Sequence, residues 1–335
     1  MDDKTISLAH GSGGKLMHDL IKDLFLRKFD NPLLSHMSDS AILNIGETKV
    51  AFTTDTYVVK PIFFPRGDIG KLAVCGTVND LSVTGAQPIC ISCGLIIEEG
   101  FGYESLEKII DSMKEAACDA GIEIVTGDTK VVEKGTGDGI FINTSGVGVV
   151  EKKVLTLEDI HVGDKIIING GVGEHGIAVL SAREELGLNS NIESDCASLN
   201  GLISKILNCS DKVRFMRDPT RGGLATTLNE IVEGRDFGII IDEEEIPVKD
   251  YVKGACEILG FDPLYIANEG KVVIVAAAED VRRIIDGMRE EPFGKDAELI
   301  GEVVSQHKGR VCMKTLSGGT RIVDMLTGEQ LPRIC

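Results

Sequence analysis

Residues 165–176 read KIIINGGVGEHG, and this stretch decides the class of the fold. Its first part, Lys165–Asn169, carries three consecutive isoleucines, which is typical of a strand buried on both faces. Glycines follow at once, where a chain turns sharply, and a helical pattern begins near residue 175. A buried strand, a glycine turn and a helix in succession are characteristic of α/β and α+β proteins. The stretch therefore predicts a fold of that kind.

The same alternation of strands and helices continues on both sides of this stretch. Apolar periodicity predicts helices over residues 14–29, 68–81, 103–120, 175–186, 198–208, 221–233, 250–259 and 279–290. Strands are expected over residues 41–45, 49–54, 89–97, 140–149, 165–169, 238–241, 272–276, 298–303 and 311–313. Residues 151–163 are charged and strand-poor, so they form a domain junction. We expect domains over 1–153 and 154–314, followed by an extended tail over 315–335.

The totals restrict the partners and the setting of the protein. With 335 residues, of which 43% are hydrophobic, the chain is long enough for about two globular domains. The net charge of −18 argues against nucleic acid and anionic membrane as partners. Nine scattered cysteines fit a reducing compartment, and no apolar run approaches a signal segment or the ~18 residues of a membrane span. We expect a cytoplasmic protein.

Three glycine-rich loops are candidates for binding phosphate. The first opens the first helix, where free N–H groups and a lysine favour an anion, although a plain flexible segment fits equally well. It comprises Gly11, Ser12, Gly13, Gly14 and Lys15. The second, residues 171–176, matches GxGxxG but lacks a following strand that ends in an acid, so a tight turn is favoured over a dinucleotide site. The third, residues 217–223, fits an anion site and a charged helix cap equally.

Four aspartates lie at expected turns or element ends of the N-terminal half. They are Asp39, Asp55, Asp80 and Asp128. A single aspartate in such a place is usually a cap. Four of them in the half that holds the first glycine loop fit Mg²⁺, which takes carboxylate oxygens and leaves positions for phosphate. Cys90 and Cys93 have CxxC spacing, but inside a strand they point to opposite faces, so we interpret them as strand core.

Several motifs resemble the aminoimidazole-ribonucleotide-synthetase (PurM-like) superfamily, and the resemblance covers essentially the whole chain. They are the first glycine loop, Thr53-Thr54-Asp55-Thr56, Gly76-Thr77-Val78-Asn79-Asp80-Leu81, Thr126-Gly127-Asp128-Thr129-Lys130 and Asp218-Pro219-Thr220-Arg221-Gly222-Gly223. Three more resemble the carbamoyl dehydratases of hydrogenase maturation within that superfamily. These are Phe63-Phe64-Pro65, Ala267-Asn268-Glu269-Gly270 and the closing Pro332-Arg333-Ile334-Cys335. Arg66 departs from the pattern, because a second glycine is expected there.

The resemblance implies a two-domain PurM-like architecture. Its N-terminal domain of sheet and helices dimerises, its C-terminal domain is an α/β sandwich, and its tail is flexible. It also implies ATP and Mg²⁺ as cofactors, with the four aspartates on the metal. The ATP-binding residues that it implies are the first glycine loop with Thr54, Asn79 and Gly127. The catalytic residues that it implies are Cys335, Glu269 and Lys130.

The activity implied by the resemblance is the dehydration of a carbamoyl group. The carbamoyltransferase HypF places this group on the Cys335 sulfur, ATP phosphorylates its oxygen, and loss of phosphate leaves a thiocyanate. The cyano group then passes to iron on a HypC–HypD scaffold for nickel–iron hydrogenase. Amide oxygen is a very poor leaving group, so it must first be converted to a phosphate, and this step requires an ATP site. Positioning and charge neutralisation supply most of the catalysis of phosphoryl transfer. Glu269 would be a base, and Lys130 would first of all neutralise phosphate charge.

Two other functions stay open. One is a small-molecule kinase or ligase of the same superfamily, such as thiamine-phosphate kinase or selenophosphate synthetase. The second of these carries a catalytic cysteine or selenocysteine before the first glycine loop, where this chain has Ser7–His10. The other is a non-enzymatic carrier that only presents the thiol of Cys335. The terminal carboxylate beside this thiol raises its pKa, so Arg333 or a cationic pocket must compensate.

Overall fold

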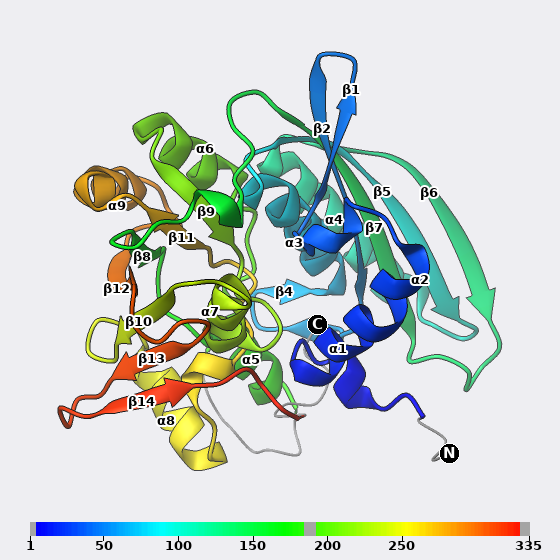
Figure 1. Ribbon diagram of the computed structural model, residues 1–335. Coiled ribbons are helices and arrows are strands. Elements are labelled where there is room, and N and C mark those ends of the chain that lie inside the picture. The colour runs from blue at the N-terminus through cyan, green and yellow to red at the C-terminus, as the bar shows by residue number, and fades with distance from the viewer. Residues whose placement is uncertain (1–4, 184–191, 329–335) are drawn as a thin grey trace.

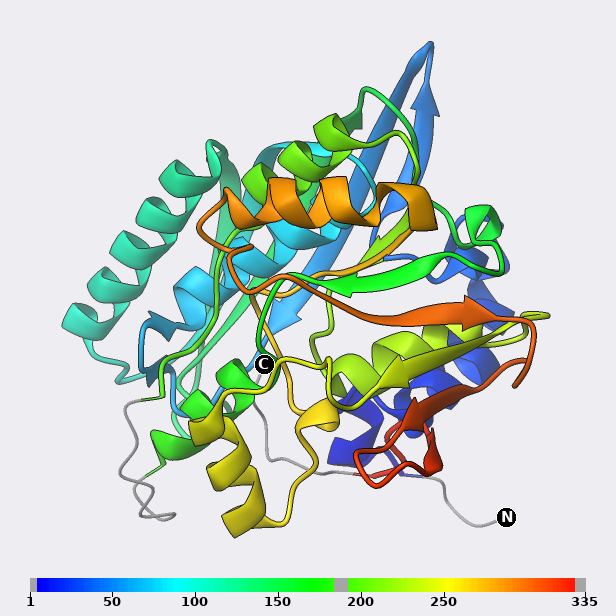
Figure 2. The ribbon, with the colours of Figure 1, turned by 90° about the vertical axis from the view of Figure 1, so that its left-hand side faces the viewer.

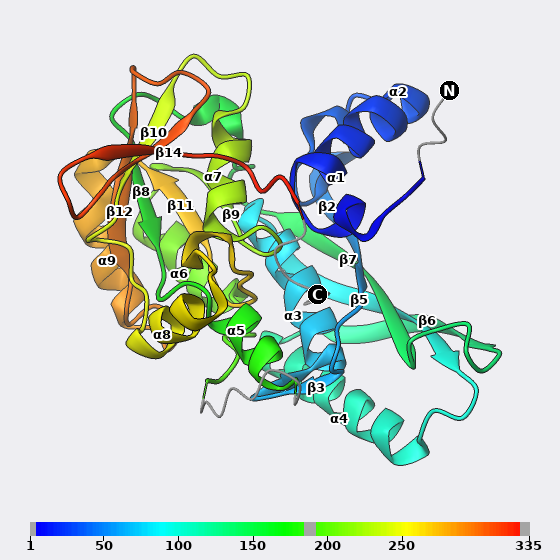
Figure 3. The ribbon, with the colours of Figure 1, turned by 90° about the horizontal axis from the view of Figure 1, so that it is seen from below.

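The computed structural model describes residues 5–183 and 192–328. The chain forms two lobes side by side, each built on its own large sheet (Figures 1 and 3). This arrangement confirms the α+β class that the alternating pattern predicts. None of the helices in the described ranges is long and apolar enough to cross a membrane.

The N-terminal lobe contains a five-stranded sheet in the order β1-β2-β7-β5-β6. Its strands are β1 Ala41–Ile45, β2 Thr48–Tyr57, β5 Gln87–Glu98, β6 Glu123–Val132 and β7 Ile140–Val150. Helices α3 (Ile69–Val83) and α4 (Tyr103–Ala120) cover one face, and the other face of β5 and β6 is open (Figure 3). Shorter elements complete the lobe: α1 Lys15–Leu20, a wider helical turn Ile21–Leu26, α2 Arg27–Phe29, β3 Phe63–Phe64 and β4 Gly67–Asp68.

Helix α3 joins the two lobes because its sequence is apolar on every side. Nearly all of its residues are buried, which is expected of a helix enclosed by protein rather than one with a single core-facing stripe. Asp68 begins it as an N-cap, since its carboxylate accepts hydrogen bonds from the N–H groups of Gly70 and Lys71 at 2.7 and 3.1 Å. One side of α3 packs on β2 and β7, and another packs on the C-terminal lobe. Residues of α3 can therefore face a site between the lobes.

The C-terminal lobe contains a seven-stranded sheet in the order β14-β13-β10-β12-β8-β11-β9. Its strands are β8 Lys165–Ile168, β9 Val213–Arg217, β10 Gly238–Asp242, β11 Val273–Ala276, β12 Glu298–Val304, β13 Val311–Lys314 and β14 Thr320–Val323. Its helices are α5 Glu174–Ser181, α6 Asn200–Cys209, α7 Gly223–Val232, α8 Asp250–Leu259 and α9 Val281–Arg289. Helices α6 and α9 cover one face and α7 covers the other, while α5 and α8 share a core with the N-terminal lobe (Figures 1 and 2).

The stretch over residues 165–176 forms the predicted strand, turn and helix, and its GxGxxG loop is a turn. Strand β8 pairs with β11 and β12, and both pairings are antiparallel. A dinucleotide site requires a parallel strand after the helix, so this loop is not part of a βαβ unit. Gly173 has φ +87° and its N–H donates to Oδ1 of Asn268 at 2.7 Å. The loop glycines therefore serve the tight turn.

Besides the short β3 and β4, three strands of the two large sheets were not expected from the sequence. Strand β6 contains glycine and aspartate, which are poor strand formers, and it forms because it pairs in parallel with β5 at the sheet edge. Strand β9 follows a charged turn and pairs with β11. Strand β14 lies within the stretch assigned to the extended tail and pairs with β13. The prediction of an extended tail is therefore wrong for residues 320–323, because hydrogen bonds to β13 hold them as a strand at the edge of the sheet.

Candidate active site

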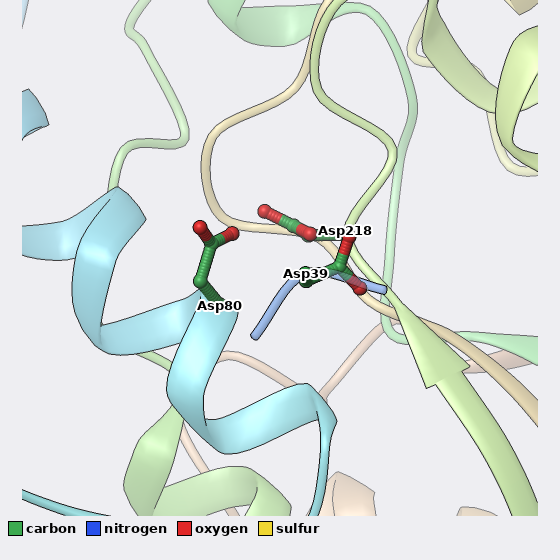
Figure 4. A group of neighbouring side chains, drawn as sticks. All are labelled: Asp39, Asp80 and Asp218. Atoms are coloured by element: carbon green, nitrogen blue, oxygen red, sulfur yellow. The ribbon is translucent and has the colours of Figure 1, made fainter. Parts of the chain in front are cut away.

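Three aspartates from both lobes meet between the sheets, as Figure 4 shows. Asp39 precedes β1, Asp80 lies on α3, and Asp218 follows β9 in the third glycine loop. One carboxylate oxygen of each lies within 4.8 Å of the others. The sequence predicted the first two as metal ligands, and it left the loop of the third open between an anion site and a helix cap. Contacts between residues far apart in the sequence place Asp218 in the cluster.

Neighbouring side chains hold the carboxylates in place. The hydroxyl of Thr53 donates to Asp80 at 3.0 Å and to the backbone carbonyl of Asp39 at 2.7 Å. Nε of Arg217 donates to Asp39 at 3.0 Å, and the same guanidinium contacts Glu230 at 3.2 Å. Arg217 is the residue directly before Asp218, so one turn supplies both a metal-site carboxylate and the cation that orients another.

The cluster carries more negative charge than its protein neighbours neutralise. Burial raises the pKa of Asp218 to about 8, and the Asp39 carboxylate beside it adds to this effect. Burial, followed by the charge of Asp218, also raises the pKa of Asp80 well above its usual value. Crowded carboxylates shift in this direction when no cation separates them.

Asp55 and Glu269 lie near the same cluster. Asp55 extends from the face of β2 that packs on α3, since it pairs with the buried Thr144 of β7. Glu269 is 4% exposed, and burial followed by the charge of Asp218 raises its pKa well above its usual value. Asp55 also contributes to that shift. The structure thus brings together three of the four predicted metal residues and one predicted catalytic residue, with Asp218 as an addition.

The donors in this cluster fit Mg²⁺. All are carboxylate oxygens, they come from rigid elements, and their charges repel one another without a cation. Mg²⁺ prefers oxygen ligands and keeps positions for phosphate oxygens. Asp39, Asp80 and Asp218, with Asp55 beside them, are the residues that would hold it.

The first and third glycine loops lie against each other at the edge of this cluster. Nη1 of Arg221 donates to the carbonyl of Gly11 at 3.2 Å. Gly13 has φ +80°, and a Cβ there would lie only 2.5 Å from the Cβ of Arg221. The N–H of Lys15 donates to the carbonyl of Leu326 at 2.7 Å, so the end of the described chain also reaches this loop. The amino group of Lys15 forms an exposed ion pair with Asp19 at 3.0 Å.

Asn79 joins the two lobes beside the cluster. Its amide donates to the carbonyls of Ala197 and Glu269 at 3.1 and 3.5 Å, and its Oδ1 accepts from the N–H of Leu199 at 2.8 Å. These bonds occupy its amide, so its observed contacts are structural. They fix the backbone of Glu269 relative to α3, one residue from Asp80.

The other predicted residues of the N-terminal sheet lie elsewhere. Lys130 forms an ion pair with Asp128 at 2.6 Å on β6, and both side chains are about 70% exposed. Asp128 aligns with Gly94, Asn143 and Thr56 across the sheet, on the open face that also carries Thr54. Asp55 points to the other face, and β6 is three strands away from β2, or about 14 Å.

This position separates Asp128 from the three predicted aspartates that lie together within one chain. Asp128 was taken as a turn residue, but it lies in the middle of an edge strand. Gly127 next to it packs against the carbonyl of Cys93, which explains the glycine by close strand approach. Within one chain, Asp128, Lys130, Thr54 and Gly127 are therefore separate from the acid cluster. Cys335 and Arg333 lie outside the described residues.

Comparisons with known proteins agree with this architecture. The family model of the AIR synthase related protein, N-terminal domain, matches residues 37–150, and the model of its C-terminal domain matches residues 161–314. Fold and acid cluster thus define a two-domain protein of the PurM-like class, which confirms the predicted architecture.

Individual relatives resemble the chain over almost all of its length. Carbamoyl dehydratase HypE of Azotobacter vinelandii is 47% identical over 332 residues, or 99% of this chain and 97% of that protein. A chain of a solved HypE–HypF complex is 49% identical with a TM-score of 0.87, covering 92% of this chain and 99% of its own. HypE solved with ATP is 46% identical with a TM-score of 0.82, covering 97% and 98%. The chain belongs to the HypE family.

Proposed function

We propose that this chain is an ATP-dependent carbamoyl dehydratase of hydrogenase maturation that acts in the cytoplasm. It converts a carbamoyl group on the Cys335 sulfur to a thiocyanate, with Mg²⁺ as the metal. A HypF-type carbamoyltransferase loads the thiol, as the solved HypE–HypF complex suggests, and a HypC–HypD complex receives the cyano group. The observation that carries the proposal is the acid cluster with Glu269 beside it, between the lobes.

The end of the described chain supports delivery of the thiol to this cluster. Leu326 contacts Lys15 of the first glycine loop, and Cys335 follows nine residues later. Nine residues of extended chain span about 30 Å, which is ample for reaching a site bordered by that loop. The first glycine loop supplies N–H groups for phosphate, and the aspartates would hold Mg²⁺, which neutralises charge on the phosphates.

Glu269 is suited to remove a proton from the carbamoyl nitrogen. A carboxylate whose pKa is raised is a stronger base than an ordinary one. Burial and the charge of Asp218 supply that shift here. Its backbone is fixed by Asp195, whose Oδ1 accepts from the Glu269 N–H at 3.1 Å, and by Asn79. Loss of phosphate from the activated oxygen and of the nitrogen protons then leaves the triple bond of the cyano group.

In our proposal, Lys130 and Asp128 contribute to the active site of a second copy of the chain. They lie on the open face of the N-terminal sheet, together with the exposed apolar residues Phe52 and Ile96. An open sheet face that is partly apolar favours association, and the homodimer would be built through this half. Lys130 would neutralise phosphate charge there.

Mixed dimers test this division of labour. Neither Glu269→Gln nor Lys130→Ala homodimers should dehydrate the carbamoyl group. If the two residues of one site come from different chains, random mixed dimers regain one intact site, and about a quarter of the wild-type activity returns. Subunit exchange is measured separately by native mass spectrometry of the mixture, in which one variant carries a tag that changes its mass. Persistent inactivity of the mixture, with exchange demonstrated, would place both residues in one chain's site.

Intact-mass spectrometry of the carbamoylated chain tests the function itself. With ATP and Mg²⁺, the adduct on Cys335 should lose one water, about 18 Da, with ADP formed in equal amount. The matched control lacks only Mg²⁺ and should keep the carbamoyl group. An adduct that stays intact with both present leaves only the carrier role. ATP turnover on a free metabolite without the tail would instead favour a small-molecule kinase.

A further inference from the structure

A second cavity between the lobes is separate from the acid cluster. It has a volume of about 880 Å³, and its wall includes Cys75 of α3 and Cys196 of the segment before α6. The described residues that line it include Arg66 and Lys71. They do not include Asp39, Asp55, Asp80 or Asp218, the residues that would hold the metal. Both cysteines are at most 2% exposed, and both line this cavity, so a solute would reach them from it.

The two thiols come from different lobes and line the same cavity wall. The hydroxyl of Ser198, two residues after Cys196, donates to Sγ of Cys75 at 3.4 Å, which places the two cysteine segments side by side. The backbone of Cys196 is fixed, because its N–H donates to the hydroxyl of Ser194 at 3.1 Å. Asn79, one helical turn after Cys75, binds Ala197 and Leu199 on either side of Ser198. The thiol pair therefore sits beside an existing connection between the lobes.

The surroundings of the pair differ from those of the other buried cysteines. The neighbouring thiol of Cys196 lowers the pKa of Cys75, and Ser198 and the charge of Lys71 act in the same direction. The pKa of Cys196 is raised. At Cys256, by contrast, burial and then the charge of Asp262 raise the pKa to about 11. A thiol of lowered pKa next to a second thiol is the arrangement used for thiol–disulfide exchange.

We propose that Cys75 and Cys196 form a redox-active dithiol site that reacts with small disulfides of the glutathione class. The Cys75 thiolate attacks one sulfur of glutathione disulfide and releases one glutathione thiolate, which leaves a mixed disulfide. Cys196 gives its proton to solvent and attacks the Cys75 sulfur, which releases the second glutathione. Two electrons pass from the protein to glutathione disulfide, and a disulfide joins the lobes. Lys71 on the cavity wall offers a cation to one carboxylate of that molecule, whereas Arg66 already pairs with Glu193 of the same wall at 3.4 Å.

Peptide mapping of the full-length Cys335→Ser variant tests this site without interference from the terminal thiol. After treatment with glutathione disulfide, the variant should lose two hydrogens, about 2 Da, and give a cross-linked peptide pair containing Cys75 and Cys196. Adding Cys196→Ser should stop the reaction at one glutathione on Cys75. Adding Cys256→Ser instead should leave the cross-link unchanged.

The exposed Cys118 supplies an internal standard for the treatment. If Cys118 becomes glutathionylated while Cys75 and Cys196 both remain free thiols, the proposal is overturned. The peptide map of the Cys335→Ser parent decides this even if the Cys196→Ser variant fails to fold. A mixed disulfide on Cys75 that never resolves onto Cys196 would equally exclude the dithiol site. None of these outcomes depends on the dehydratase function.

Discussion

Cys335→Ser should abolish thiocyanate formation, with a loss of at least about 10³-fold, because a hydroxyl is a far weaker nucleophile than a thiolate at neutral pH. The carbamoyl group would find no acceptor, although every residue of the acid cluster remains. The measurement is cyanide released after incubation with a HypF-type carbamoyltransferase, carbamoyl donor, ATP and Mg²⁺. Binding of a non-hydrolysable ATP analogue by titration calorimetry should stay unchanged.

The control for this variant is Cys118→Ser. Cys118 is an exposed cysteine at the end of α4, and its replacement should leave cyanide formation at the wild-type level. The pair of variants separates a specific terminal thiol from a general need for surface thiols. Cyanide formation by the Cys335→Ser protein at a rate near that of wild-type would contradict the function proposed here, whatever its effect on stability.

The elements around the site could be predicted from sequence wherever the pattern is local. Helix α3 was expected from its many apolar residues, and its observed bounds differ by two residues or fewer from the prediction. The hairpin of β1 and β2 follows from two apolar runs around Gly46. Strand β6 was missed because its pairing with β5, and not its own residues, makes it a strand.

The site could be predicted only in part for the same reason. Asp80 and Asp55 are recognisable because they belong to motifs within single elements. Asp218 is separated from Asp80 by more than a hundred residues, and its proline-containing turn resembles an ordinary helix start. A signal was nonetheless present: two arginines and an aspartate around a glycine pair exceed what a cap needs. Asp128 shows a further limit, since membership in a motif does not fix which face of a sheet a side chain occupies or which chain's site it serves.

Asp218→Asn should lower ATP-dependent dehydration by about 10²-fold or more and, at the same time, stabilise the metal-free protein. The amide keeps the shape of the side chain but donates less charge to Mg²⁺, so turnover falls. In metal-free protein the same change removes a carboxyl group that must either be charged beside other carboxylates or take up a proton at a cost in free energy, so the folded chain gains stability. Opposite effects on activity and stability are expected of a residue retained for function.

The stability difference should depend on pH in a definite direction. The pKa of Asp218 is about 8 in the folded chain, against its usual value of 3.8. The folded state therefore binds this proton more tightly, and the associated stability is complete below pH 3.8 and lost as pH rises through 8. Wild-type should lose up to about 1.4 kcal/mol per pH unit from this group across that window, and Asp218→Asn should not.

Urea unfolding in EDTA at pH 5.5, 7 and 8.5 measures this dependence. The free energy of unfolding of Asp218→Asn should exceed that of wild-type by a margin that grows with pH. Asp236→Asn, at a fully exposed aspartate, should follow wild-type at each pH. With ATP and Mg²⁺ added, the order should reverse, because ligands that bind only the folded state stabilise the chain that holds them better. A variant that is less stable than wild-type in EDTA at pH 8.5 would show that Asp218 serves the fold rather than a cation, and the metal assignment would have to move to other acids.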